Sequence, residues 1–164
     1  MLAVGLTEEQ IKPFRARLDE AGLTIACFNS PKSLTLSGKA STIDSFHKRM
    51  SQLGHFSRKL KVNVAYHSAQ MEIIADQYRR ILSSHVEHFR ARKDIKFNSS
   101  VHPGIRVETN YEYWVQNMLY PVYFSDALDH MVSEEDVAFK LDVLLEVGPY
   151  STLAGPIHPT DPGQ

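Results

Sequence analysis

The sequence predicts an α+β fold for residues 1–64, followed by part of an α/β fold over residues 65–157. Two stretches of the first segment carry apolar residues at helical spacing, and each is closed by a glycine. Short apolar or alternating runs flank these stretches, as strands do. In the second segment Leu141–Val147 is largely apolar, which is typical of a parallel strand buried on both faces.

The first helix is predicted after the apolar strand Met1–Leu6. Thr7 stands three residues before Gln10, which is the spacing of a capping box at a helix N-terminus. The apolar stripe that follows at helical spacing consists of Ile11, Phe14, Leu18 and Ala21. Because a proline inside a helix loses a hydrogen bond, Pro13 favours a start near Lys12, with the proline in the first turn.

The same pattern then repeats. Leu23–Phe28 and Ser33–Ser37 are predicted strands, joined by the turn Asn29–Pro31. A second helix begins near Ser41, and its stripe consists of Ile43, Phe46, Met50 and Leu53. Phe56–Val64 follows as an alternating strand. Its apolar residues, which we expect to face the core, are Phe56, Leu60, Val62 and Val64.

The order of these elements is βαββαβ, the ferredoxin-like unit, in which both helices cover one face of a four-stranded antiparallel sheet. The second segment does not repeat this plan. Its predicted helices begin at Ser68, Tyr111, Phe124 and Ser151, and its predicted strands are Ile95–Val101 and Leu141–Val147. Residues 158–164 are expected to form a disordered tail.

The composition excludes several classes of protein. The 164 residues carry a formal net charge of -1, without the basic surplus typical of a nucleic-acid-binding domain. The single cysteine, Cys27, excludes a disulfide framework and a multi-cysteine zinc site. No apolar run approaches the ~20 residues that span a bilayer, and Met1–Leu6 lacks the basic start of a signal peptide. We therefore expect a cytoplasmic protein that binds neither nucleic acid nor membrane.

His67 is the candidate catalytic residue. It stands where the last strand of the first segment ends and a helix begins, a position that fixes a side chain while leaving it exposed. A neutral imidazole there can act as a general base, although a histidine that merely caps or lines the junction would have the same position. His85 and His88 have helical i, i+3 spacing, but no cysteine or carboxylate pattern joins them, so no metal site is predicted.

No activated nucleophile accompanies this histidine. None of the eight glycines begins a Gly-x-Ser-x-Gly elbow, the turn that presents an activated serine. Cys27 lies in an apolar strand without the electropositive setting of a reactive thiol. A P-loop, a dinucleotide fingerprint and a His-Glu-x-x-His motif are absent as well. The residues alone thus indicate half of a possible catalytic pair.

Short motifs occur along nearly the whole chain, up to about Ile157. They are Met1–Leu6, Asn29–Pro31, Leu36–Gly38, Lys59–Ser68 with Met71, Asn98–Val101, Tyr113–Met118, Pro121–Phe124, Glu146–Pro149 and Leu153–Pro156. In this order they resemble the acyltransferase domain of iterative type I polyketide synthases, above all the highly reducing fungal kind.

The resemblance implies ping-pong acyl transfer with His67 as the base of a serine nucleophile. The serine would take malonyl from malonyl-CoA, and the phosphopantetheine thiol of an acyl carrier protein would collect it, without a bound cofactor. A backbone carbonyl would orient the other ring nitrogen of His67. An aromatic residue before the histidine, here Tyr66, is typical of family members that select malonyl over methylmalonyl; simple packing of Tyr66 at the junction is the alternative.

The sequence also departs from the family. It lacks the elbow serine, the oxyanion-hole donors and the arginine that binds the malonyl carboxylate, and Tyr150 replaces a histidine that often follows Gly-Pro. We therefore expect a small subdomain, residues 1–64, and the C-terminal part of an acyltransferase large subdomain, residues 65–157, inactive by themselves. The alternatives are a non-catalytic module that docks a carrier protein or another synthase domain, partly through Lys59 and Lys61, or a truncated product without its own function.

Overall fold

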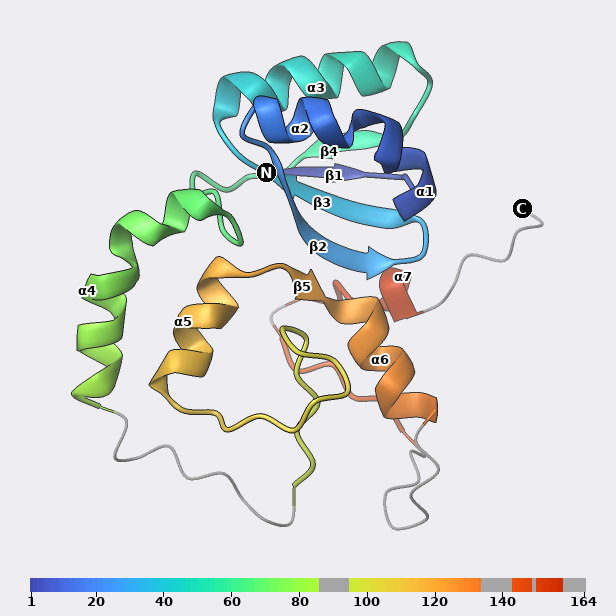
Figure 1. Ribbon diagram of the computed structural model, residues 1–164. Helices are drawn as coiled ribbons and strands as arrows, with labels where there is room; N and C mark the ends of the chain where they lie inside the picture. Colours follow the sequence, from blue (N-terminus) through green and yellow to red (C-terminus); the bar gives the residue numbers. More distant parts are fainter. Residues whose placement is uncertain (86–94, 134–142, 149, 158–164) are drawn as a thin grey trace.

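The computed structural model describes residues 1–85, 95–133, 143–148 and 150–157 of the chain. Its centre is a five-stranded sheet in the order β4-β1-β3-β2-β5 (Figure 1). The strands are β1 (Leu2–Val4), β2 (Thr24–Ser30), β3 (Ser33–Ser37), β4 (Ser57–Lys59) and β5 (Val122–Tyr123). The first four pair antiparallel, as predicted, whereas β5 joins β2 in parallel. The βαββαβ unit is therefore present, and the second segment of the chain extends its sheet by one strand.

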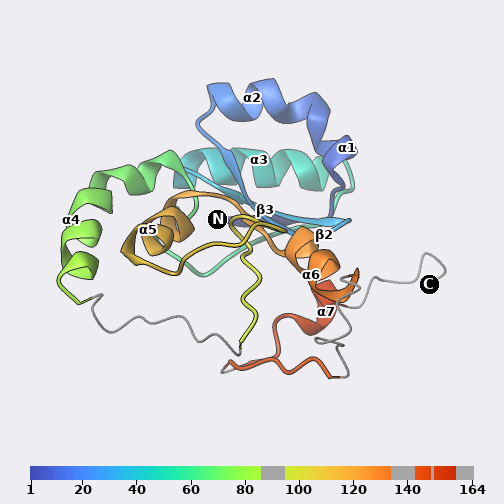
Figure 2. The ribbon, with the colours of Figure 1, turned by 60° about the horizontal axis from the view of Figure 1, so that its bottom comes forward.

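The helices of the first segment lie on one side of this sheet (Figure 2). They are α1 (Glu8–Ile11), the 3-10 turn η1 (Lys12–Phe14), α2 (Arg15–Glu20) and α3 (Ala40–Gln52). The predicted capping box is present, because Thr7 and Gln10 each accept the backbone N–H of the other with a side-chain oxygen. The helical region begins at Glu8 and not near Lys12, since the 3-10 turn accommodates Pro13.

The apolar stripes of these helices meet the strands in one buried core. Its members are Leu2, Val4, Leu6, Ile11, Leu18, Leu23, Ile25, Phe28, Leu34, Leu36, Ile43, Phe46 and Met50. Phe14 packs edge-on against Phe46, with ring centroids 5.9 Å apart, and so connects the 3-10 turn η1 to α3. Burying one such side chain contributes about 1.5–3 kcal/mol. Leu53 stays half exposed because α3 ends at Gln52.

The second segment places helices beside the edge of the sheet at β5. They are the 3-10 turn η2 (Ala69–Met71), α4 (Glu72–Ser83), α5 (Tyr111–Leu119), α6 (Phe124–Ser133) and α7 (Ala154–Ile157), so the predicted starts of α5 and α6 are confirmed. An ion pair between Arg79 and Glu112, with N–O distances of 2.8 and 3.2 Å, joins α4 to α5. None of the helices in the described ranges is long and apolar enough to cross a bilayer.

The predicted strand Phe56–Val64 is shorter in the structure. The pairing of β4 with β1 covers Ser57–Lys59, and one further bond runs from the Leu60 N–H to the Met1 carbonyl. Three residues expected in the core are instead 62%, 42% and 40% exposed: Phe56, Val62 and Val64. That prediction is wrong: Phe56 lies just before β4, and the chain leaves the sheet after Leu60, before it reaches Val62 and Val64.

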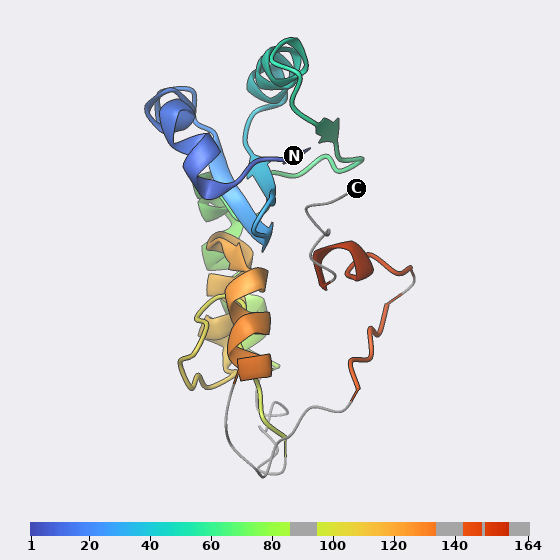
Figure 3. The ribbon, with the colours of Figure 1, turned by 90° about the vertical axis from the view of Figure 1, so that its right-hand side faces the viewer.

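Two further predicted strands are irregular in the structure. In Ile95–Val101, the Ser99 hydroxyl accepts the N–H groups of Val101 and His102, which turns the chain out of an extended path. Residues 143–147 form no strand and run along the side of the molecule, with Leu145 82% exposed (Figure 3). Within the described ranges no strand pairs with them, so the predicted burial on both faces is wrong there. Residues 141–142 and the predicted tail 158–164 lie outside the described residues.

Candidate active site around His67

The backbone of His67 has a conformation that few residues other than glycine adopt. Its φ angle is 58°, and it is the single non-glycine residue with positive φ in the described part of the chain. Such a conformation costs on the order of 1–3 kcal/mol, so the surroundings have to hold the residue there. The His67 N–H donates to the Met118 carbonyl at 3.0 Å, and the Ser68 hydroxyl donates to the Ala65 carbonyl at 2.6 Å. Hydrogen bonds on both sides thus fix His67 at its junction.

The imidazole ring of His67 contacts the C-terminal end of α5. Its Nδ1 atom lies 3.0 Å from the carbonyl oxygen of Tyr120, and the backbone of Asn117 is a second hydrogen-bond partner. Because a carbonyl oxygen can only accept, Nδ1 carries the proton of the neutral ring and Nε2 carries the lone pair. Nε2 is therefore the atom that can take a proton from a nucleophile.

Burial of the ring lowers the pKa of His67, because desolvation disfavours the charged imidazolium. The hydrogen bonds to the carbonyls of Tyr120 and Asn117 act in the opposite direction and do not cancel this effect. The neutral form consequently dominates at neutral pH. A general base has to be in this form before it can act.

Tyr66 lies beside His67 at the surface. Its side chain is 44% exposed, and the two ring centroids are 6.3 Å apart with a tilt of 48° between the planes. The two residues are neighbours in the chain, so this proximity follows from the sequence itself. The exposed ring leaves Tyr66 in a position from which it can contact a molecule bound next to the histidine.

Cys27 lies in β2 and Lys59 in β4, and Lys61 follows two residues after β4. Burial raises the pKa of the Cys27 thiol to about 11, so this side chain remains a thiol at neutral pH, in agreement with its assignment as unreactive. Lys59 forms an ion pair with Asp44 of α3, which neutralises part of its positive charge. Lys61 is exposed.

The remaining candidates do not join the site. The Nδ1 atom of His85 lies 2.8 Å from the Ile81 carbonyl oxygen, which accepts a hydrogen bond from it, and His88 lies outside the described residues. Tyr150 is 79% exposed. In the described ranges, no three side chains of histidine, cysteine, aspartate or glutamate gather in a way that could hold a metal ion.

The family resemblance implied that a backbone carbonyl orients His67, but it did not indicate which residues supply the hydrogen bonds. Tyr120, Met118 and Asn117 act through backbone carbonyls, which every residue has, so their side chains give no signal. One signal was available in the pair Tyr120-Pro121, because a residue before proline avoids the helical conformation. Tyr120 is indeed extended, with ψ at 158°, and its carbonyl is thereby turned out of the helix.

The fold resembles known acyltransferase structures. A family model described as the acyl transferase domain matches residues 1–160. The acyltransferase domain from the second module of the salinomycin polyketide synthase is 27% identical, with a TM-score of 0.65, over 80% of this chain and 30% of that one. A loading acyltransferase from the avermectin modular polyketide synthase is 26% identical, with a TM-score of 0.67, over 76% of this chain and 40% of that one.

Curated relatives are fungal synthases. A highly reducing polyketide synthase of Talaromyces stipitatus is 35% identical and one of Emericella nidulans is 37% identical, each over 96% of this chain. Each match covers only 7% of the relative's own length. The chain therefore corresponds to a small part of these large synthases.

Proposed function

The chain belongs to the acyl transferase domain family found in polyketide synthases, and we propose that it supplies the general base for malonyl transfer from malonyl-CoA to an acyl carrier protein. The observation that carries this proposal is the hydrogen bond between Nδ1 of His67 and the Tyr120 carbonyl. It leaves Nε2 unprotonated in the neutral ring and orients it. The nucleophile in this proposal is a serine from a segment of the enzyme that this sequence does not contain.

In the first half-reaction Nε2 of His67 takes the proton from the serine hydroxyl. The serine oxygen attacks the thioester carbon of malonyl-CoA, and the C–S bond then breaks. The imidazolium gives its proton to the departing CoA thiolate, which leaves malonyl-serine and a neutral histidine.

The second half-reaction repeats these steps with the carrier protein. Nε2 takes the proton from the phosphopantetheine thiol, whose sulfur attacks the carbonyl carbon of malonyl-serine. The ester C–O bond breaks, and the imidazolium returns a proton to the serine oxygen. The carbonyls at the end of α5 favour the transient imidazolium, since the C-terminus of a helix carries partial negative charge.

Tyr66 is proposed to contact the malonyl group. Its exposed ring next to His67 would occupy space that the α-methyl group of methylmalonyl needs. One such carbon is worth about 1–3 kcal/mol of discrimination, so the preference for malonyl is expected to be moderate.

The proposal is tested with labelled malonyl-CoA. In a synthase that contains this chain and an elbow serine, His67→Ala is expected to abolish labelling of the carrier protein, while the variant keeps the circular dichroism of the parent. The isolated 164-residue chain is expected to stay unlabelled. Near-normal transfer by the His67→Ala enzyme would overturn the assigned role, and a covalent adduct on the isolated chain would overturn the external nucleophile.

One observation favours docking as a second function. Residues 1–64 contain ten lysines and arginines but only five aspartates and glutamates, although the whole chain has a net charge of -1. This surplus would attract an acidic partner such as a carrier protein. Charge reversal at Lys61, which is exposed, is expected to weaken such binding at low salt.

A further inference from the structure

A buried polar cluster lies against α5, the helix whose C-terminal end contacts the imidazole of His67. Ser99 is 1% exposed and Tyr113 of α5 is 5% exposed, and their hydroxyl oxygens are 3.1 Å apart. The Ser99 oxygen also accepts the backbone N–H groups of Val101 and His102, at 3.1 and 3.0 Å. One serine thus closes the turn 99–102 and attaches it to α5.

The same turn holds the segment that carries the Tyr120 carbonyl. The Ser100 carbonyl accepts the Tyr123 N–H at 2.7 Å, and the Gln116 carbonyl accepts the Tyr120 N–H at 2.8 Å. The Nε2 atom of His102 lies 2.8 Å from the side-chain oxygen of Gln116. Residues 120–123 are therefore fixed from two directions, by α5 and by the turn.

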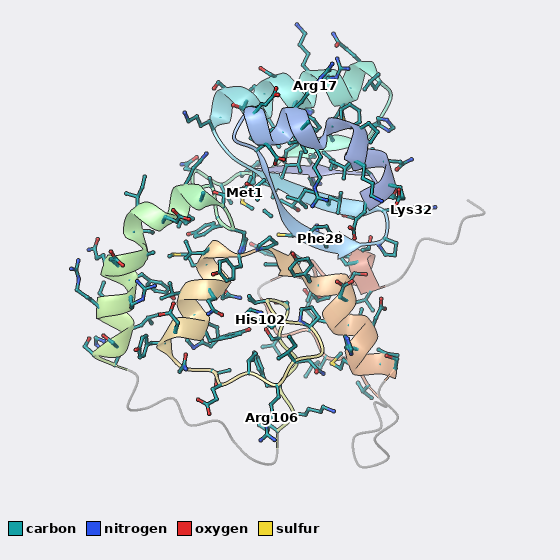
Figure 4. The ribbon with its side chains drawn as sticks, viewed as in Figure 1. Met1, Arg17, Phe28, Lys32, His102 and Arg106 are labelled. Carbon is teal, nitrogen blue, oxygen red and sulfur yellow. The ribbon has the colours of Figure 1, made fainter. Side chains whose placement is uncertain are left out.

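The turn 99–104 packs between α5 and α6. Figure 4 shows His102 on the loop that precedes α5 in the chain, in the space between the ribbons of α5 and α6. Gly104, with φ at 70°, lies so close to His130 of α6 that an added Cβ atom would come within 2.5 Å of the imidazole Nε2. The turn 99–104 cannot move away from α5 without displacing these contacts.

From these contacts we infer that Ser99 and Tyr113 are positioning residues for His67, which rests on the proposed function of His67 as the base. The path has three steps. The Ser99–Tyr113 contact sets the turn against α5, the turn and α5 together set residues 120–123, and the Tyr120 carbonyl fixes the proton on Nδ1 of His67. Neither hydroxyl touches the reacting atoms.

Spacing along α5 supports this path. Tyr113 and Gln116 are three residues apart in α5, so they occupy neighbouring positions on one face of the helix, and Tyr120 follows the helix directly. Gln116 is the residue whose carbonyl and side chain contact Tyr120 and His102. A rotation or tilt of α5 that follows loss of the Tyr113 hydroxyl contact would therefore be transmitted to the Tyr120 carbonyl.

The test is nitrogen-15 NMR of the 164-residue chain, with the His67→Ala variant used to assign the ring signals. In the parent, His67 is expected to be the Nδ1–H tautomer, with a slowly exchanging Nδ1–H proton. Ser99→Ala and Tyr113→Phe are expected to lose this proton signal and to show a mixture of tautomers. Ser99→Thr, which keeps the hydroxyl, is expected to restore the parent spectrum.

Tyr111→Phe is the matched control, because it removes a tyrosine hydroxyl from an exposed position at the start of the same helix. It is expected to leave the His67 signals unchanged. If Ser99→Ala does not fold, Tyr113→Phe decides the question. A folded Tyr113→Phe variant with an unchanged His67 tautomer would overturn the positioning role. The tautomer of His67 is measured without malonyl transfer, so the test distinguishes failure of this inference from failure of the proposed function.

Discussion

The Nδ1 atom of His67 lies 3.0 Å from the backbone carbonyl oxygen of Tyr120, which is 53 residues further along the chain. A carbonyl fixes the tautomer of a histidine as a carboxylate would, but it adds no full negative charge to a partly buried site. Desolvation lowers the pKa of His67, and the hydrogen bond to the Tyr120 carbonyl opposes this effect without cancelling it, so the base remains neutral at the pH at which it has to act.

The lowered pKa of His67 predicts how stability depends on pH. The unfolded chain binds a proton at His67 near the ordinary histidine pKa, about 6.5, whereas the folded chain binds it only at lower pH. Stability should therefore fall as the pH drops below about 6.5. Urea unfolding at pH 7 and pH 5.5 measures the effect. His67→Gln should show a smaller loss over the same interval, and an equal loss in both proteins would contradict the assigned shift.

The left-handed backbone conformation of His67 predicts which substitutions at this position destabilise the fold most. Asparagine tolerates positive φ, whereas a β-branched valine strongly disfavours it. His67→Val should therefore be less stable than His67→Asn by on the order of 1–3 kcal/mol, although neither side chain can act as the base. Urea denaturation of the two variants tests this directly. Equal stabilities would mean that the backbone relaxes out of the left-handed region.

The ion pair of Arg79 with Glu112 predicts a salt-sensitive coupling between α4 and α5. The two side chains are 37% and 41% exposed, so the coupling should be small and should weaken as sodium chloride is added. A double-mutant cycle with Arg79→Ala and Glu112→Ala measures it. Because Arg79 lowers the pKa of Glu112, the coupling is present at neutral pH and is lost as the pH falls through that lowered pKa. A coupling that persists at acid pH would rule out the ionic interpretation.

Tyr66 predicts the acyl preference of the enzyme. In a synthase that contains this chain, Tyr66→Ser should raise the kcat/KM for methylmalonyl-CoA relative to malonyl-CoA by roughly 10–200-fold, the range expected for one carbon. Tyr66→Phe is the control, because it keeps the ring and should keep the preference. Competition between the two thioesters in one reaction gives the ratio. If the serine variant keeps the parental ratio, Tyr66 only packs at the junction.

Local patterns predicted the helices and the first three strands of the first segment, because caps and apolar stripes depend on residues close together in the chain; the fourth strand is shorter than its pattern predicted. The stripe of α3, with Ile43, Phe46 and Met50, is buried as its spacing requires, and the Thr7 capping box starts its helix. His67 was identified as the residue after the predicted strand Phe56–Val64, but β4 ends at Lys59, so an irregular stretch of seven residues separates the strand from the histidine. The neighbours of His67 could not be identified, since they are backbone groups brought close by folding.

Long-range pairing explains the remaining differences. β5 consists of two residues, Val122 and Tyr123, and no periodicity can be read from so short a strand. Ile95–Val101 has the apolar residues of a strand, but the Ser99 hydroxyl binds the N–H groups that a neighbouring strand would need. The spacing of apolar side chains does not determine which groups accept the backbone N–H groups of a segment.

The small strand β5 also has a mechanical consequence. It pairs with β2 through Cys27–Val122 and Phe28–Tyr123, and the rings of the second pair are stacked with centroids 4.9 Å apart. Tyr120 stands two residues before this strand. The pairing of β5 with β2 thus connects the ferredoxin-like sheet to the segment that carries the Tyr120 carbonyl, so a displacement of β2 would be passed on to the group that orients His67.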